Sequence, residues 1–253
     1  MILHLPDGGP GTVSAALHEP ATAAGSPALL VLTHGAGGNR DTPGLVSLAD
    51  ALAERNIRTL RFNLPAAEAG RRRPDGSERA TACVAAVVDR AAREFGNPVF
   101  LGGRSFGGRM ASLMLADESA AARRLVAGLV LLAYPLKPPG KAEVPPERME
   151  HLPRIGVPTL FVSGDRDPFA PPALLNPVVA AARAEVCWIA GGDHGFRVPK
   201  AVLGATGRNP ADVPDEIAGA VAAFMAATAA RGPAGADQAL PPTSARRPRT
   251  SRS

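Results

Sequence analysis

The chain has 253 residues, of which 45% are hydrophobic, and it carries a formal net charge of +5. This length and composition fit one ordinary α/β domain with a sizeable buried core. The N-terminus lacks the basic start and long apolar core of a secretory signal, and no apolar run approaches the roughly 18 residues of a membrane span. We therefore expect a soluble cytoplasmic protein that does not contact a membrane.

The positive charge is concentrated at the C-terminus. Residues 231–253 contain five arginines and one aspartate, and therefore hold +4 of the net charge of +5. A nucleic-acid-binding domain concentrates its basic residues on a folded face, so we predict no nucleic-acid partner. The last segment is rich in Pro, Ala, Ser and Arg, which is typical of disorder. The sequence therefore predicts one folded domain over 1–230 and a disordered basic tail over 231–253.

Deletion of residues 231–253 is accordingly expected to leave the melting temperature and the turnover almost unchanged, because a disordered tail buries little apolar surface. Thermal unfolding and kinetic assays of the truncated and full chains check this expectation. A large loss of either quantity would show that the tail belongs to the fold.

Apolar strand-like runs alternate with helical patterns along the chain. The predicted strands are 12–17, 28–33, 57–63, 98–102, 127–133, 157–163 and 185–190, and the predicted helices are 45–55, 77–94 and 215–230. Such alternation predicts a mostly parallel sheet with helices on both faces, and we expect the first strand to form an antiparallel edge. The segment 135–154 has six prolines and no helical period, which predicts an extended crossing and no large lid.

A glycine-rich loop, His34-Gly35-Ala36-Gly37-Gly38, follows the predicted strand 28–33. Glycines let backbone N–H groups approach a negatively charged oxygen closely. We expect the amide of Ala36, or of its neighbour Gly37, to form one half of an oxyanion hole, with His34 bracing the loop. The alternative is a phosphate-binding loop, but the chain has neither a P-loop motif nor the G-x-G-x-x-G spacing here. We therefore predict no nucleotide cofactor.

Three consecutive arginines, Arg71, Arg72 and Arg73, lie in a loop after the predicted strand 57–63. Guanidinium groups bind carboxylates and phosphates, so Arg71 and Arg72 are candidates for the rim of a site that takes an anionic substrate. Arg104 and Arg109 are further candidates. The alternative is a solvated basic turn that binds nothing.

The motif Gly103-Arg104-Ser105-Phe106-Gly107 lies between a predicted strand and a helix-like stretch. This is the setting of a nucleophile elbow, in which a sharp turn presents a serine hydroxyl to the substrate. Ser105 is therefore the candidate nucleophile, and the amide of Phe106 is the second candidate oxyanion donor. In isolation a serine here would more often be a helix N-cap.

An aspartate and a histidine follow the last two predicted strands. Asp165 and Asp167 come after strand 157–163, and His194 comes after strand 185–190. The order Ser, Asp, His is the one that this elbow motif requires, and the carboxyl ends of parallel strands meet at one edge of a sheet. We predict that His194 is the general base and acid and that Asp167 orients it, with Asp165 as the rival. Taken singly, these residues would be read as turn formers or solvated loop residues.

Cys83 and Cys187 are the only cysteines, which favours a reducing compartment, buried thiols and no disulfide. No metal-ligand spacing of His and Cys occurs, so we predict no metal.

Several motifs together resemble one family. They are His34-Gly35-Ala36-Gly37-Gly38, Gly102 to Ser112, Tyr134-Pro135-Leu136, Pro138 to Lys141 and Asp167-Pro168-Phe169, with weaker matches at Phe62-Asn63 and Glu68 to Arg72. Over about residues 10–230 the chain is similar to a group of small bacterial α/β-hydrolase-like proteins. The group includes a testis-expressed animal protein and a scaffold subunit of a histone-acetyltransferase complex, and is distantly related to dienelactone hydrolases. Lys137 stands where a histidine is expected in relatives.

The resemblance implies the three-layer α/β-hydrolase fold, with Ser105, Asp167 and His194 at the matching triad positions. Dienelactone hydrolases proper use a cysteine, so the serine here points to esterase-like chemistry. The primary hypothesis is a cofactor-free serine hydrolase that acts on a small ester or thioester through an acyl-enzyme. The alternatives are an acyltransferase with the same triad and a non-catalytic interaction module, since fold does not imply function.

Overall fold

The computed structural model describes residues 1–4, 11–21, 28–96, 99–138, 140–141 and 143–231. The predicted tail lies outside the described residues, except for Arg231, which is the last residue of the final helix.

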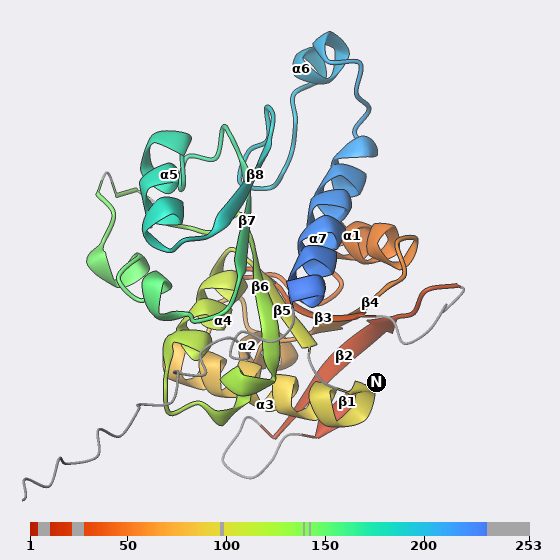
Figure 1. Cartoon of the computed structure of the whole chain (residues 1–253), viewed down its shortest axis with the longest axis vertical. Helices are drawn as coiled ribbons and strands as arrows, with labels where there is room; N and C mark the ends of the chain where they lie inside the picture. Colours follow the sequence, from red (N-terminus) through yellow and green to blue (C-terminus); the bar gives the residue numbers. More distant parts are fainter. Residues whose placement is uncertain (5–10, 22–27, 97–98, 139, 142, 232–253) are drawn as a thin grey trace, which may run out of the picture.

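One open sheet of eight strands forms the centre of the molecule (Figure 1). The strands are β1 (Ile2–His4), β2 (Thr12–His18), β3 (Ala28–Thr33), β4 (Ile57–Phe62), β5 (Val99–Arg104), β6 (Val126–Leu132), β7 (Thr159–Gly164) and β8 (Glu185–Ile189). They lie side by side in the order β1-β2-β4-β3-β5-β6-β7-β8. The β1–β2 and β2–β4 pairs are antiparallel and the other pairs are parallel. The predicted mostly parallel α/β sheet is confirmed, but β2 is not the edge because β1 pairs with its outer side.

Helices cover both faces of the sheet, as predicted (Figure 1). They are α1 (Pro43–Ala53), α2 (Pro65–Glu68), α3 (Ser77–Phe95), α4 (Phe106–Ala116), α5 (Pro172–Ala181), α6 (Lys200–Ala205) and α7 (Asp212–Arg231). Helices α1 and α7 pack on one face, and α3 and α4 pack on the other. The sequence patterns missed α5, α6 and the single turn of α2.

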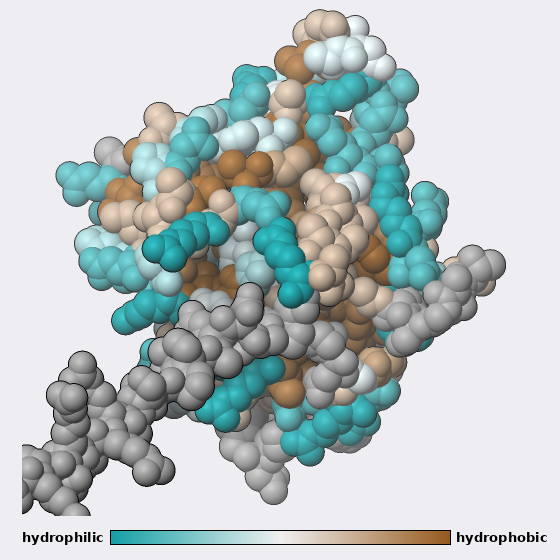
Figure 2. All heavy atoms as spheres, in the orientation of Figure 1, coloured by the Kyte–Doolittle hydropathy of each residue, from teal (hydrophilic) through white to brown (hydrophobic). Residues whose placement is uncertain are grey.

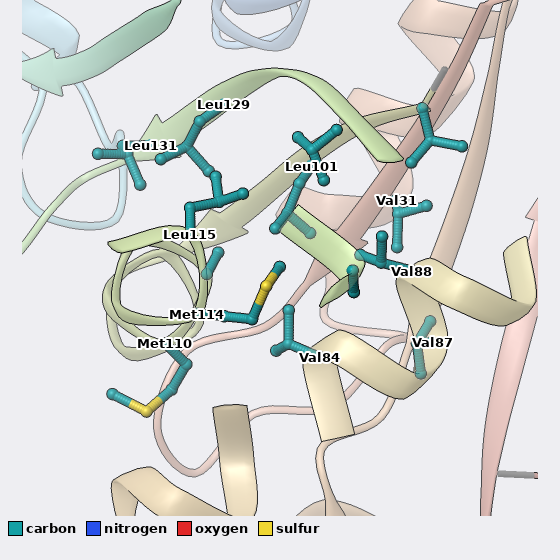
Figure 3. Close-up of a cluster of buried hydrophobic side chains, with 14 of the residues drawn as sticks. Val31, Val84, Val87, Val88, Leu101, Met110, Met114, Leu115, Leu129 and Leu131 are labelled. Carbon is teal, nitrogen blue, oxygen red and sulfur yellow. The ribbon is translucent and has the colours of Figure 1, made fainter. Parts of the chain in front are cut away.

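The core has two parts because successive side chains of a strand point to opposite faces. In β5, Leu101 points to the layer of α3 and α4, whereas Phe100 points to the layer of α1 and α7. Helix α3 buries Val84, Val87 and Val88 on one side, at the spacing of a helical face. Figure 3 draws Val84 and Val88 of α3 in one buried cluster with Leu101 of β5 and Met114 of α4.

Helix α7 has the length and hydropathy that a membrane span needs, with a mean hydropathy of 1.2. However, its larger apolar side chains are buried against the sheet and α1, among them Ile217, Val221 and Phe224. Burial of this kind is what a core helix shows, so the apolar character of α7 is accounted for by packing.

The segment that connects β6 to its neighbour β7 forms no helical lid in its described residues. It contains two 3₁₀ turns, Pro146–Arg148 and Leu152–Arg154. The Tyr134 hydroxyl donates to the carbonyl of Arg148 at 2.8 Å, and the Arg148 guanidinium donates to the carbonyl of Pro135 at 3.0 Å. These bonds fix the crossing. On the face shown in Figure 2, hydrophilic and apolar residues are interspersed.

Candidate active site

Ser105 occupies the sharp turn between β5 and α4. Its backbone has φ 50° and ψ −114°, a conformation that L residues rarely adopt and that is retained mainly at functional sites. The amide of Ser105 donates to the carbonyl of Leu132 in β6. The carbonyl of Ser105 accepts the amide of Arg109, which is the first hydrogen bond of α4. The strained turn is thus held by the strand on one side and by the helix on the other.

Glycines make this turn sterically possible. A Cβ atom on Gly108 would lie 2.6 Å from the carbonyl oxygen of Gly103, and one on Gly107 would lie 2.7 Å from the side chain of Thr33. Real Cβ atoms do not approach this closely, so the backbones of β5, α4 and β3 meet here only because these side chains are absent. Gly107 and Gly108 therefore have a packing role.

The structure brings Ser105, His194 and Asp167 together, although they are far apart in the sequence. The Nε2 atom of His194 lies 2.9 Å from the Ser105 hydroxyl, and its Nδ1 atom lies 2.7 Å from a carboxylate oxygen of Asp167. Because an ionised carboxylate only accepts hydrogen bonds, we assign the ring proton to Nδ1. Nε2 is then free to accept the serine proton, which is the arrangement that general-base activation needs.

Asp167 and the His194 ring are held by further contacts. The Asp167 side chain is fully buried, and its second carboxylate oxygen accepts the amide of Phe169 at 2.8 Å. The ring of Phe169 meets the imidazole edge-on, with 4.6 Å between centroids. Sequence reasoning assigned no role to Phe169; its position two residues after an aspartate at a strand end was the available signal.

Asp165, the rival for the acid role, has a different partner. One of its carboxylate oxygens accepts the amide of Gly191 at 2.7 Å. This bond ties the end of β7 to the loop that carries His194. The same two segments approach so closely that a Cβ atom on Gly164 would collide with the backbone of Gly192. Asp165 therefore braces the loop, whereas Asp167 contacts the imidazole.

The glycine-rich loop after β3 lies beside the elbow. The ring of His34 bridges two backbone groups: its Nε2 accepts the amide of Leu64 at 3.0 Å, and its Nδ1 donates to the carbonyl of Gly35 at 2.8 Å. Burial lowers the pKa of His34, which keeps the ring neutral for this bridging role. The prediction that His34 braces the loop is confirmed.

A cavity of about 10 Å³ lies against Ala36, Gly37 and Phe106. That volume is close to the space that one water molecule, or one oxygen atom of a ligand, requires. Within the described part of the chain, the amides of these three residues donate to no acceptor. The structure therefore gathers the three candidate oxyanion donors around one small space.

The candidate rim arginines separate into two groups. Arg71 and Arg72 line the small cavity beside the glycine-rich loop, but Arg71 is paired with Asp75 at 3.0 Å. Arg72 forms no ion pair with the described residues, so it is the one that presents an uncompensated charge at this rim. Arg104 lies elsewhere, since it lines a second cavity on the α1 and α7 face of the sheet.

A second serine–histidine contact joins α4 to the segment between β6 and β7, and the sequence patterns did not predict it. The Ser112 hydroxyl lies 2.8 Å from Nε2 of His151, and both residues are buried. Nδ1 of His151 has no partner among the described residues, so no carboxylate orients this ring. Without an orienting acid or access for a substrate, the pair is suited to bracing the crossing segment against α4.

His151 should make the stability depend on pH. Burial, together with the charges of Arg109 and Arg154, lowers the pKa of His151 from 6.5 to about 4. The unfolded chain thus binds this proton near pH 6.5 and the folded chain only near pH 4. As the pH falls from about 6.5 to about 4, the free energy of unfolding of the wild type should therefore decrease by about 3 kcal/mol. The His151→Gln variant lacks this titrating group, so its free energy of unfolding should not show this decrease. Urea unfolding from pH 7 to pH 4 measures the difference, and parallel curves for the two proteins would contradict it.

The sequence and the fold together decide the family. A family model described as an alpha/beta hydrolase domain matches residues 26–226. The chain belongs to the α/β-hydrolase family. This result confirms the superfamily and fold expected from the motifs. The narrower resemblance to the testis-expressed and scaffold proteins stays a prediction.

This α/β-hydrolase is similar to several solved structures. Est1E from Butyrivibrio proteoclasticus, also solved with ferulic acid bound, is 18% identical with a TM-score of 0.67, and the match covers 90% of this chain and 99% of Est1E. A serine hydrolase without a lid from Xanthomonas campestris is 18% identical, with a TM-score of 0.62 and coverages of 90% and 94%. Dienelactone hydrolase from Anabaena variabilis is 17% identical, with a TM-score of 0.61 and coverages of 85% and 92%. At these identities the similarity concerns the fold.

Proposed function

We propose that this α/β-hydrolase is a serine esterase or thioesterase that works through an acyl-enzyme on a small substrate. The observation that carries the proposal is the unbroken chain of contacts from Ser105 through His194 to Asp167, with 2.9 Å and 2.7 Å between the hydrogen-bonded atoms. Membership of a hydrolase family and the similarity to esterases support the same reaction class.

The chemistry follows from the roles of the three side chains. His194 takes the hydroxyl proton as Ser105 attacks the ester carbonyl, and Asp167 stabilises the imidazolium that forms. The new oxyanion accepts hydrogen bonds from the amides of Phe106 and of Ala36 or Gly37, and one such donor typically lowers the barrier by about 3 kcal/mol. The imidazolium then protonates the leaving alcohol or thiol. Water, activated by the same histidine, releases the acid and regenerates the serine.

The reaction as proposed requires only side chains and backbone amides of this chain, so it needs no cofactor. The similarity of the fold to esterases supports a small molecule as the substrate.

A fluorophosphonate probe tests the proposal directly, because it reacts covalently only with a serine that is activated as a nucleophile. The purified full chain is treated with the probe and read by intact mass. We expect single labelling of the wild type and none of Ser105→Ala. Ser112→Ala is the matched control, since it removes the other serine that contacts a histidine, and it should label like the wild type.

An absence of labelling in a folded wild type would contradict the proposal and favour the non-catalytic module. Labelling that persists in Ser105→Ala would place the nucleophile elsewhere. Labelling that depends on Ser105 leads to a panel of short-chain esters and thioesters, with and without a competing alcohol acceptor, to separate hydrolysis from acyl transfer.

A further inference from the structure

A second cavity adjoins the elbow on the other face of the sheet and has no part in the chemistry described so far. Its volume is about 140 Å³. Its apolar walls come from α1, from the end of β6, from the loop after His194 and from the start of α7, and comprise Leu45, Leu48, Leu132, Phe196, Val213 and Ile217. A cavity of roughly 150 Å³ with leucine, isoleucine and phenylalanine walls accommodates a benzene ring. The space therefore fits an apolar group of about six carbon atoms.

The cavity lies close to the proposed catalytic residues, although none of the three lines it. Two of its lining residues are chain neighbours of those residues: Arg104 precedes Ser105, and Gly195 follows His194. Near the glycine-rich loop, Nη1 of Arg104 and Cβ of Ser105 each lie 3.5 Å from the position that a Cβ atom on Gly35 would occupy. The guanidinium thus lies at the end of the cavity that is nearest to the nucleophile.

Arg104 is the charged group of this otherwise apolar cavity. One of its N–H groups donates to the carbonyl of His194 at 3.0 Å, and it forms no ion pair with the described residues. Burial lowers its pKa, against the opposing effect of Asp167 and Asp193. A guanidinium has five N–H donors, so most of them remain available here. A partly desolvated cation with unused donors is stabilised by an anion that it can bind in a bidentate manner.

A tight turn next to His194 shapes one wall of the cavity. Phe196 has φ 59°, a left-handed conformation that is uncommon for a bulky residue. It is held by a tight turn, in which its amide donates to the carbonyl of Asp193 and the Asp193 carboxylate accepts the amides of Gly195 and Arg197. This turn places Phe196 on the wall of the cavity.

We propose that this cavity is the acyl pocket, that it takes a ring-sized apolar acyl group, and that Arg104 binds the carboxylate of the acid product. The inference rests on the proposed function, since hydrolysis by water converts the bound acyl group into that carboxylate. The preferred substrates are accordingly esters or thioesters of small aromatic or branched aliphatic acids.

Binding of benzoate tests the pocket without requiring turnover. Benzoate and benzyl alcohol share the ring and differ in charge, so the comparison isolates the guanidinium. Calorimetric titration of the full chain is expected to give an affinity for benzoate at least about tenfold higher than for benzyl alcohol. The Ser105→Ala protein should bind both compounds like the wild type. Equal affinities for the two compounds, or no binding of benzoate, would overturn the proposal.

Two variants locate the binding. Arg104→Gln should remove the preference for benzoate, while Arg90→Gln, an exposed arginine on α3, should retain it. Ile217→Trp fills the cavity and should abolish binding of both compounds, whereas Ala82→Trp fills an open groove between α3 and α4 and should not. Ile217→Trp should also lower kcat/KM for a benzoate ester at least about tenfold more than for an acetate ester. Thermal unfolding establishes that each variant is folded. Benzoate binding that neither site variant changes would overturn the proposal.

Failure of the pocket and failure of the proposed function give different results. Labelling by the fluorophosphonate probe without benzoate binding would overturn the pocket alone. Benzoate binding without labelling would overturn the hydrolase, and with it the assignment of the cavity to an acyl group.

Discussion

Replacement of Ser105 by alanine is expected to lower kcat for an ester substrate by about 10⁴-fold or more, because among the described residues no other nucleophile lies next to an oriented base. His194→Ala should cause a loss of the same order, and the double variant should be little worse than either single one, since the three residues act as a unit. Steady-state kinetics with one common ester, beside thermal unfolding of each variant, measure these effects.

Ser112→Ala provides the matched control. Ser112 lies two turns along the helix that Ser105 precedes and also contacts a histidine, but it is fully buried. Its replacement should leave kcat almost unchanged while it lowers the melting temperature. Substantial activity in Ser105→Ala, or a comparable loss in Ser112→Ala, would contradict the assignment of the nucleophile.

Asp167→Asn is expected to lower kcat by about 10⁴-fold with little change in KM, because an amide at this position stabilises the wrong imidazole tautomer and cannot stabilise the imidazolium. Asp165→Asn should have a small effect on kcat. Its side-chain oxygen can still accept the amide of Gly191, which is the one hydrogen bond that the carboxylate makes within the described part of the chain. Kinetics of the two variants under the same conditions decide between the two aspartates.

The reverse ranking would transfer the orienting role to Asp165. Equal and large losses in both variants, together with lowered melting temperatures, would instead show that both carboxylates maintain the loop that carries His194. The intact-mass labelling assay adds an independent measure, since Asp167→Asn should label far more slowly than Asp165→Asn.

Much of the fold was predictable because it depends on local patterns. Continuous apolar runs such as residues 28–33 predicted buried parallel strands, and the spacing of Val84, Val87 and Val88 agrees with the predicted helix over 77–94. The short elements escaped prediction: β1 has three residues and α2 is a single turn, so neither shows a periodic pattern. The placement of β1 outside β2 is a tertiary pairing with no local signal.

The candidate site was predictable in its order but not in its contacts. By itself, the sequence determined that a serine, an aspartate and a histidine each follow a strand, in that order along the chain. Strand ends and turns depend on local residue patterns, so they can be predicted locally. Only the tertiary structure decided that Asp167 contacts the imidazole while Asp165 accepts the amide of Gly191. The two aspartates are chemically identical and two positions apart, so the sequence alone does not distinguish their partners. The cavity beside Arg104 likewise depends on α1, β6 and α7 packing around one space. Such a cavity forms only where segments distant in the sequence pack around the same space, so no local sequence pattern predicts it.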